Sequence, residues 1–521
     1  MEKIKVNIKY QISKIKKWVE ENPKEAIALG IILFVGAFLR LYKIDQYMTF
    51  LGDEGRDVIV VRRLLVDFDP ILIGPRTSIG DMYLGPLYYY LMAPALLLAN
   101  FSPVGPAVQI ALLGIATTVF VWSIGKEWFG KFAGLIAAGL YAVAPTVIIY
   151  SRSSWNPNIM PFFALLMVYS VWKVWQRHEF KWIIVSAISF AFVLQSHYLG
   201  LLLGPVMGLF WFLTLFAIYK VKNEKKNFLK YSFISISFLA LLMSPLVIFD
   251  ARHGWRNFAS MKKFFTERQT TVSARPWNAL PKAWPNFVQI NTRLIAGHNE
   301  IVGLVTSIVM AALLMWLVLL KWKKLKLLIR NSYFIILVWL GFALLGLGVY
   351  KQHIYDHYYG FFFAAPFLLL GGLAEEILKV KNKISKLLLL AGCFLLVIVN
   401  LQNSPIKCPP NRQLQRSVGV TQKIIEEAGK EKFNLAVIAE RNYEGAYQYF
   451  LEARNAPIIM IDPQRADETI TEQLFVVCEL PKEKCDPVNN PKAEIANFGW
   501  SKIEEGWEVF GVILFKLVHT Q

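Results

Sequence analysis

Long apolar segments recur through the first 400 residues of the chain, separated by shorter polar stretches. A helix needs about 20 apolar residues to cross a hydrocarbon core of about 30 Å. The segments that approach this length are Ala26–Tyr42, Pro106–Ile124, Phe132–Tyr150, Ile159–Trp175, Trp182–Ser196, Leu199–Tyr219, Phe233–Phe249, Ile301–Leu320, Phe334–Tyr350, Tyr359–Leu373 and Leu387–Leu401. This pattern predicts a mainly α-helical, polytopic membrane protein with about 11 transmembrane helices.

A further apolar segment, Leu84–Ala99, contains Pro86 and Pro94 and either crosses the membrane or lies in its outer interface. If it does not cross and the N-terminus is cytoplasmic, the inner segments carry 24 Lys and 2 Arg. That excess is the positive-inside pattern of short loops. The inner segments are then 1–25, 125–131, 173–181, 220–230, 321–330 and 379–386. We therefore predict eleven spans, a cytoplasmic N-terminus and an extracytoplasmic C-terminus in the plasma membrane.

Three regions follow from this topology. Residues 1–25 are basic, with Ile8, Ile12, Ile15 and Val19 on one helical face, and they predict a helix on the anionic cytoplasmic surface; a solvated basic tail is the alternative. Residues 26–401 form the transmembrane domain, with long outer loops at 43–105 and 250–300.

Residues 402–521 have a mixed composition that is typical of a small extracytoplasmic α/β domain. We expect strands at 434–439, 457–461, 473–480 and 511–519, and a helix at 444–453. Cys408, Cys478 and Cys485 would lie where disulfides are permitted, in a pairing that stays open, whereas Cys393 lies inside a span.

The composition and charge of the chain limit the kinds of molecule that it is expected to bind. Of the 521 residues 55% are hydrophobic and 18% are charged, which excludes an ordinary soluble protein of this length. A net charge of +19 would suit nucleic acid, but the Lys clusters lie between apolar segments, so we expect membrane lipid as a partner and no nucleic acid. The outer loops as far as Lys351 hold ten Arg against five Lys. Because guanidinium groups suit phosphate and carboxylate, this bias predicts an anionic ligand; ordinary soluble-like loops are the alternative.

The densest polar motif is Phe50-Leu51-Gly52-Asp53-Glu54-Gly55-Arg56-Asp57, directly after the first span. Ionisable groups at a membrane edge are costly unless they are solvated or functional. A carboxylate there can serve as a general base toward an acceptor hydroxyl. The alternative is a capped helix whose first turn holds two acids because they suit the helix dipole.

Several short motifs, in order and spacing, resemble the GT-C glycosyltransferase superfamily. They are Asp53-Glu54-Gly55-Arg56 after Leu39-Arg40-Leu41-Tyr42, the run Tyr83-Leu84-Gly85-Pro86-Leu87-Tyr88-Tyr89-Tyr90, the turn Gly125-Lys126-Glu127-Trp128-Phe129-Gly130, and Pro145 with Tyr150-Ser151-Arg152. The chain is most similar to the branch that holds protein O-mannosyltransferases and lipid A aminoarabinose transferases, which is glycosyltransferase family 39-like. The likeness covers roughly residues 30–200.

The resemblance implies transfer of one sugar from a polyprenyl-phosphate carrier, with inversion, on the extracytoplasmic face. It implies that Asp53 is the general base or acceptor organiser, with Glu54 as a catalytic neighbour and Arg56 binding substrate or phosphate. The segment Ser153–Asn158 departs from the family, because it offers amides where relatives often have an acid. We therefore expect no cofactor, and a divalent metal, for which His353 and His357 have helical spacing, stays an open alternative.

Polar side chains also gather at the predicted outer ends of other spans. Cations and hydrogen-bond donors there can hold a carrier phosphate and stabilise it as it departs. The predicted substrate-binding residues are Arg56, Arg152, His197, Tyr198, Asp250, Arg252, Lys351, His353, His357 and Tyr358. All motif-bearing segments precede Gly360, so we expect the C-terminal domain to hold no catalytic residue.

The sequence thus predicts an inverting hexosyl- or pentosyltransferase that uses a polyprenyl-phosphate sugar donor. The acceptor is a protein, a glycan or a lipid of the cell envelope. An oligosaccharyltransferase-like en bloc transferase is one alternative, and a transporter or flippase of polyprenyl-linked sugars is another. Transporters usually carry internal repeats and polar residues at mid-membrane, and neither pattern occurs in this sequence.

Overall fold

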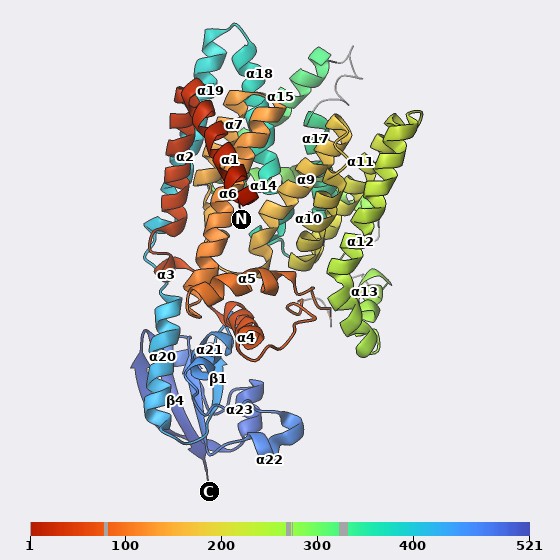
Figure 1. The fold of residues 1–521 in the computed structure, drawn as a ribbon. Helices are drawn as coiled ribbons and strands as arrows, with labels where there is room; N and C mark the ends of the chain where they lie inside the picture. The colour runs from red at the N-terminus through yellow and green to blue at the C-terminus, as the bar shows by residue number, and fades with distance from the viewer. Residues whose placement is uncertain (1, 78–81, 267–271, 274, 322–331, 521) are drawn as a thin grey trace.

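The computed structural model describes residues 2–77, 82–266, 272–273, 275–321 and 332–520. Its helices are α1 Glu2–Glu21, α2 Pro23–Leu41, α3 Ile44–Tyr47, α4 Gly52–Val66, α5 Leu87–Leu98, α6 Val104–Trp128, α7 Lys131–Val143, α8 Pro145–Ile149, α9 Met160–Arg177, α10 Trp182–Ser196, α11 Leu203–Ala217, α12 Lys222–Arg252, α13 Arg256–Thr266, α14 Leu280–Leu294, α15 Glu300–Lys321, α17 Ser332–Val349, α18 Ala364–Lys379, α19 Lys383–Gln402, α20 Gln413–Ala428, α21 Gly445–Ala453, α22 Ala466–Thr469 and α23 Ala493–Phe498. Three 3₁₀ helices bear on the site, namely η1 Asn156–Ile159, η2 Tyr198–Leu202 and η5 Asp356–Phe362. Long helices form a bundle, and a smaller domain hangs from one end of it (Figure 1).

Seven helices of the described chain are long and apolar enough to cross a membrane, and an eighth span results if η5 and α18, bent by 59°, count as one. The other expected spans correspond to α2, to α7 with α8, and to α10. Helix α2 carries Lys24, Glu25 and Arg40, while α7 ends at Val143 before Pro145, and α10 has 15 residues. Because 15 residues of helix extend only about 22 Å, the total of eleven stays a prediction.

Helix α5 corresponds to the ambiguous apolar segment Leu84–Ala99. It runs across the lower ends of the long helices, beside α4, instead of along the bundle (Figure 1). This placement suits the interpretation in which the segment lies in the interface. The lysine-rich segments 220–230 and 379–386, which include the turns between α11 and α12 and between α18 and α19, lie at the opposite, upper end (Figure 1).

A buried acid near the start of α2 is paired. Glu25 is buried in α2 and accepts a hydrogen bond from Trp122 and an ion pair from Lys126 at 2.9 Å. Lys126 also lies over the ring of Trp18 on α1. A carboxylate inside an apolar helix is tolerated because these partners satisfy it.

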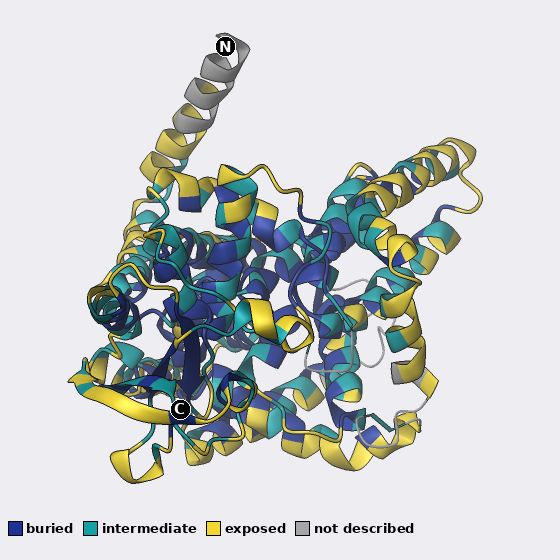
Figure 2. Ribbon diagram, turned by 90° about the horizontal axis from the view of Figure 1, so that it is seen from below, coloured by how far each residue is buried: buried dark blue, intermediate teal, exposed yellow. Residues whose placement is uncertain are grey.

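The C-terminal domain holds a four-stranded sheet in the order β1-β2-β4-β3, with β1 Asn434–Ile438 parallel to β2 Gln473–Cys478. Strand β4 Val512–His519 pairs antiparallel with both β2 and β3 Ser501–Val509. β1 and β2 are buried along their whole length, whereas β3 is a largely exposed edge strand (Figure 2). Helices α20 and α21 pack against each other, and side chains of both join the core of the sheet.

The expected strands at 434–439, 473–480 and 511–519 and the helix at 444–453 are confirmed to within a few residues. The strand expected at 457–461 is wrong, because Ile458 makes only a single parallel bridge to Phe433. Strand β3 was not expected, since Lys502, Glu504, Glu505 and Glu508 hide the apolar alternation that marks a strand. Cys478 and Cys485 form a disulfide, and Cys393 and Cys408 are free.

Cysteine labelling tests the predicted orientation without an engineered tag. Cys408 is exposed just after the last span, whereas Cys393 lies within α19. A membrane-impermeant maleimide added to intact cells should therefore label the protein at Cys408, and Cys408→Ser should abolish that labelling. Labelling that appears only after the membrane is permeabilised would place the C-terminal domain inside the cell.

Candidate active site

Helix α4 lies at the end of the bundle that faces the C-terminal domain, and the acidic motif lies in its first turns. The Glu54 side chain turns back and accepts a hydrogen bond from the backbone N–H of Leu51 at 3.0 Å, which caps the helix. Glu54 is buried, and burial raises its pKa to about 7. Glu54, predicted as catalytic, is therefore placed by the structure as a helix cap, whereas Asp53 beside it is 43% exposed.

Arg56 ties the two remaining acids of the motif together. Its Nη1 donates to Asp53 Oδ1 at 2.7 Å, and its Nε and Nη2 donate to Asp57 Oδ1 at 3.0 and 2.7 Å. The Tyr89 hydroxyl from α5 donates to the same Asp57 oxygen at 2.9 Å. Asp57 is completely buried, so its charge depends on Arg56, because an unpaired buried carboxylate is strongly destabilising.

A tyrosine from the C-terminal domain completes this cluster. The Tyr443 hydroxyl donates to Asp53 Oδ1 at 2.6 Å, and Arg56 Nη1 donates to the Tyr443 oxygen at 3.2 Å. Nothing in the local sequence around Tyr443 indicates this role. The expectation that the C-terminal domain holds no catalytic residue stays a prediction, and Tyr443 contacts the predicted base directly.

A cavity of about 570 Å³ opens beside this cluster. It collects six of the predicted site residues from three separate parts of the chain: Asp53, Arg56, His197, Tyr198, His357 and Tyr358. Residues that the sequence analysis did not single out as site residues also line it, namely Pro75, Arg76, Thr77, Leu84, Trp155, Asn156 and Pro157. The lining thus combines an acid and guanidinium groups with a cluster of imidazole and aromatic rings, the aromatic wall.

The aromatic wall is built between α10 and η5. His197 and His357 lie with ring centroids 5.8 Å apart, and His357 packs edge-on against Trp155 at 4.7 Å. His197 Nδ1 accepts from the backbone N–H of Leu199 at 3.2 Å, so the proton of the neutral ring is assigned to Nε2. Asn156 is held by its amide, which donates to the Ser196 carbonyl at 2.6 Å.

Other predicted residues do not line this cavity. Arg152 is buried and donates to the carbonyls of Leu39 and Tyr42, at 3.0 and 2.7 Å, so it braces the end of α2. Asp250 accepts from the backbone N–H groups of Asn257 and Phe258 and thereby caps α13.

Arg252 and Lys351 are exposed, and neither lines the cavity. His353 lines a second hollow of about 800 Å³ on the other side of the segment 353–358. There, Arg293 and Asp356 form a two-pronged ion pair at 2.7 and 2.6 Å. The sequence analysis did not pair these residues, because they are 63 positions apart.

Within the described residues no group of three or more His, Cys, Asp or Glu side chains could hold a metal ion.

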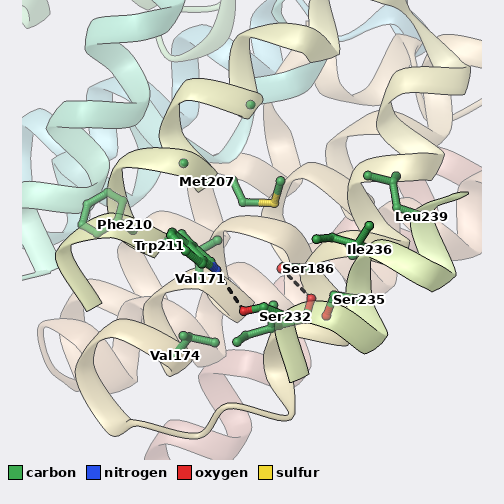
Figure 3. A pocket seen from close by; sticks show the side chains of 14 residues that line it. Val171, Val174, Ser186, Met207, Phe210, Trp211, Ser232, Ser235, Ile236 and Leu239 are labelled. Carbon is green, nitrogen blue, oxygen red and sulfur yellow. Dashed lines mark hydrogen bonds between the residues drawn. The ribbon is translucent and has the colours of Figure 1, made fainter. Parts of the chain in front are cut away.

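A third pocket, of about 220 Å³, lies between α9, α10, α11 and α12 (Figure 3). Its lining is almost wholly apolar, and its polar contacts are internal, such as the bond from Trp211 Nε1 to Ser232 Oγ at 2.9 Å (Figure 3). None of the described residues that line it is ionisable. It therefore offers no acid–base chemistry, and the cavity at Asp53 remains the candidate active site.

Comparisons with known proteins bear on the fold. The family model of dolichyl-phosphate-mannose-protein mannosyltransferase matches residues 84–249. Comparison with curated protein sequences finds no match. The structure of ArnT from Cupriavidus metallidurans bound to undecaprenyl phosphate matches with a TM-score of 0.57 at 11% identity, over 95% of this chain and 98% of that one. The archaeal oligosaccharyltransferase AglB from Archaeoglobus fulgidus, in complex with an inhibitory peptide and a dolichol-phosphate, matches with a TM-score of 0.52 at 13% identity, over 89% and 70%.

The resemblance to the GT-C superfamily, on its O-mannosyltransferase and aminoarabinose-transferase side, is confirmed by these matches. At such low identity the structural likeness establishes the fold, while substrates depend on the site.

The buried cap Glu54 predicts a pH-dependent stability. An acid whose pKa is raised on folding stays protonated in the folded state and ionises first in the unfolded state, so stability falls as pH rises from about 4.5 to about 7. Glu54→Gln keeps the acceptor for Leu51 but cannot ionise. The stability of the parent relative to Glu54→Gln should therefore drop by about 2–3 kcal/mol between pH 4.5 and pH 8, as measured by thermal unfolding in detergent. A difference that does not change with pH would mean that Glu54 is solvated.

Proposed function

We propose that the protein is an inverting glycosyltransferase that moves a sugar from a polyprenyl-phosphate carrier to an acceptor hydroxyl on the extracytoplasmic face. The observation that carries this proposal is the single cavity that joins Asp53 and Arg56 to His197 and His357. An acid, a guanidinium and imidazole donors are what transfer of a sugar between a phosphate and a hydroxyl requires. The lysine-rich segments at the opposite end of the bundle support the proposal that the reaction takes place on the extracytoplasmic face.

The acceptor oxygen forms the new bond to the anomeric carbon as the bond from that carbon to the phosphate oxygen breaks. The electron pair leaves with the carrier phosphate, and the proton of the acceptor hydroxyl passes to Asp53. Among the described residues Asp53 Oδ2 accepts no hydrogen bond, so this oxygen is available to the acceptor. Arg56, which is half-buried, holds Asp53 and is itself held by the buried Asp57.

The departing phosphate needs hydrogen-bond donors. Arg76, His357 and the Nε2–H of His197 are donors among the residues that line the cavity. Charge-assisted bonds from such groups stabilise a phosphate as its charge grows. We propose no resident metal, because the acids and imidazoles that the structure describes around the cavity do not gather into a ligand set.

An en bloc oligosaccharyltransferase would use the same acid and phosphate contacts, and the size of the donor distinguishes the two reactions. A flippase is less well supported, because the polar cavity is lined by Asp53 and Arg56 of α4, a helix that lies at one end of the bundle (Figure 1) and not halfway along it. The sugar, whether hexose or pentose, depends on contacts that only a bound donor reveals.

Asp53 provides the direct test of the proposed function. Asp53→Asn keeps the acceptor atom for Arg56 and Tyr443 but removes the base, so turnover of radiolabelled polyprenyl-phosphate sugar should fall by about 10²-fold or more. Donor binding and the unfolding temperature should stay near those of the parent. Turnover at the parent's rate would refute Asp53 as the base.

His357 tests the position of the phosphate. His357→Ala removes a cavity donor and should weaken donor binding by about tenfold, as expected for one hydrogen bond to a charged group. The matched control is His178→Ala, because His178 is an exposed histidine that pairs with Glu224 away from the cavity. If Arg252→Ala weakens donor binding and His357→Ala does not, the phosphate lies nearer α12, since Arg252 is also among the substrate-binding residues that the sequence predicts.

A further inference from the structure

The hydroxyl of Tyr443 and the guanidinium of Arg56 converge on one oxygen of Asp53. Tyr443 lies just before α21 in the C-terminal domain, 390 positions after Asp53. Both donors reach Oδ1, at 2.6 and 2.7 Å, and they are also hydrogen-bonded to each other. The three groups close a small ring across the boundary between the membrane domain and the C-terminal domain.

We propose that Tyr443 is a positioning residue, which holds Asp53 Oδ1 so that Oδ2 faces the acceptor hydroxyl. The active site is then shared, and the C-terminal domain must be docked for the base to be oriented. This inference rests on the proposed function, in which Asp53 takes the acceptor proton.

Asp53 needs such an anchor because of where it lies. It is in the first turn of α4 and is nearly half exposed, so its carboxylate would otherwise rotate freely at the edge of the cavity. One donor fixes a distance, whereas two donors on the same oxygen also fix the plane of the carboxylate. Correct orientation of a base is worth a large factor in rate, and small misplacements are costly.

Tyr443 is suited to act as a permanent donor. Burial raises the pKa of its phenol well above the usual range, and the nearby Asp53 carboxylate also raises it. The hydroxyl therefore keeps its proton at every physiological pH. A phenol that cannot ionise holds the carboxylate without competing for the proton that the base must collect.

The backbone fixes the phenol ring against the start of α4. A Cβ added at Gly52 would approach the Tyr443 ring to 2.4 Å, and one added at Gly445 would approach the Gly52 carbonyl oxygen to 2.4 Å. Asn442 accepts from the Gly52 N–H at 2.8 Å and donates to Glu479 at 2.7 Å. The loop before α21 is thus tied to both domains, and side chains larger than hydrogen would push them apart.

Tyr443→Phe tests the hydroxyl alone. We expect kcat to fall about 10- to 100-fold, with the KM for the donor and the unfolding temperature near those of the parent. The matched control is Tyr447→Phe, which removes a hydroxyl that donates to Glu479 within the C-terminal domain at 2.6 Å. The control should keep kcat near the parent's value. An unchanged kcat in Tyr443→Phe, or an equal loss in the control, overturns the proposal.

A double-mutant cycle separates positioning from a general structural role. If Tyr443 acts through Asp53, Tyr443→Phe should cause no further loss of kcat in the Asp53→Asn background. Losses that multiply in the two backgrounds would contradict the inference. Its failure differs from failure of the proposed function: the first leaves Asp53→Asn inactive and Tyr443→Phe active, whereas the second leaves Asp53→Asn active.

Discussion

The close packing of α4 against α21 is the contact on which the candidate site depends. Gly52 and Gly55 on one helix meet Gly445 on the other, and a Cβ at any of these positions would come within 2.5 Å of the opposing segment. Because the two helices approach so closely, the start of α21 lies directly against the acidic first turn of α4. The rest of the interface reinforces the contact, with Arg63 paired to Glu452 at 3.0 Å.

The acidic turn in turn depends on buried charge. Asp57 has no solvent contact, and Arg56 and Tyr89 supply its hydrogen bonds. Removing Arg56 would leave an uncompensated carboxylate inside the protein, which is strongly destabilising. The same guanidinium reaches Asp53, so one side chain stabilises the turn and, together with Tyr443, holds the exposed acid. Three acids in five positions thus differ in their surroundings: Glu54 caps the helix, Asp57 is buried against Arg56, and Asp53, the proposed base, is partly exposed.

Local patterns in the sequence predict the parts of this arrangement that are local. The apolar segments and the lysine bias give the bundle and the end that bears the site, and the motif after the first span gives Asp53 and Arg56. The sequence also groups His197 with Tyr198 and His357 with Tyr358 as outer-face residues. It cannot show that these pairs face one another, because their approach depends on how α10 and η5 pack.

Other roles are set by contacts that a single sequence does not encode in any local pattern. Glu54 is an acid next to the predicted base and was therefore predicted to be catalytic, yet its side chain accepts a hydrogen bond from the backbone N–H of Leu51. Asp250 and Arg152 were predicted to bind substrate. In the structure Asp250 accepts hydrogen bonds from N–H groups at the start of a helix, and Arg152 donates to carbonyl groups at the end of another. No local sequence motif marks Tyr443, and only the docking of the two domains brings it to Asp53.

The anomeric configuration of the first-formed product tests the central claim most directly, because it distinguishes a base from a nucleophile. A carboxylate that only takes the acceptor proton allows a single displacement, which inverts the anomeric carbon, whereas a carboxylate that attacks the sugar gives two displacements and retention. Nuclear magnetic resonance of the product, formed from a donor of known configuration, reads the outcome. The account predicts inversion. Retention, or a sugar covalently attached to Asp53, would contradict it.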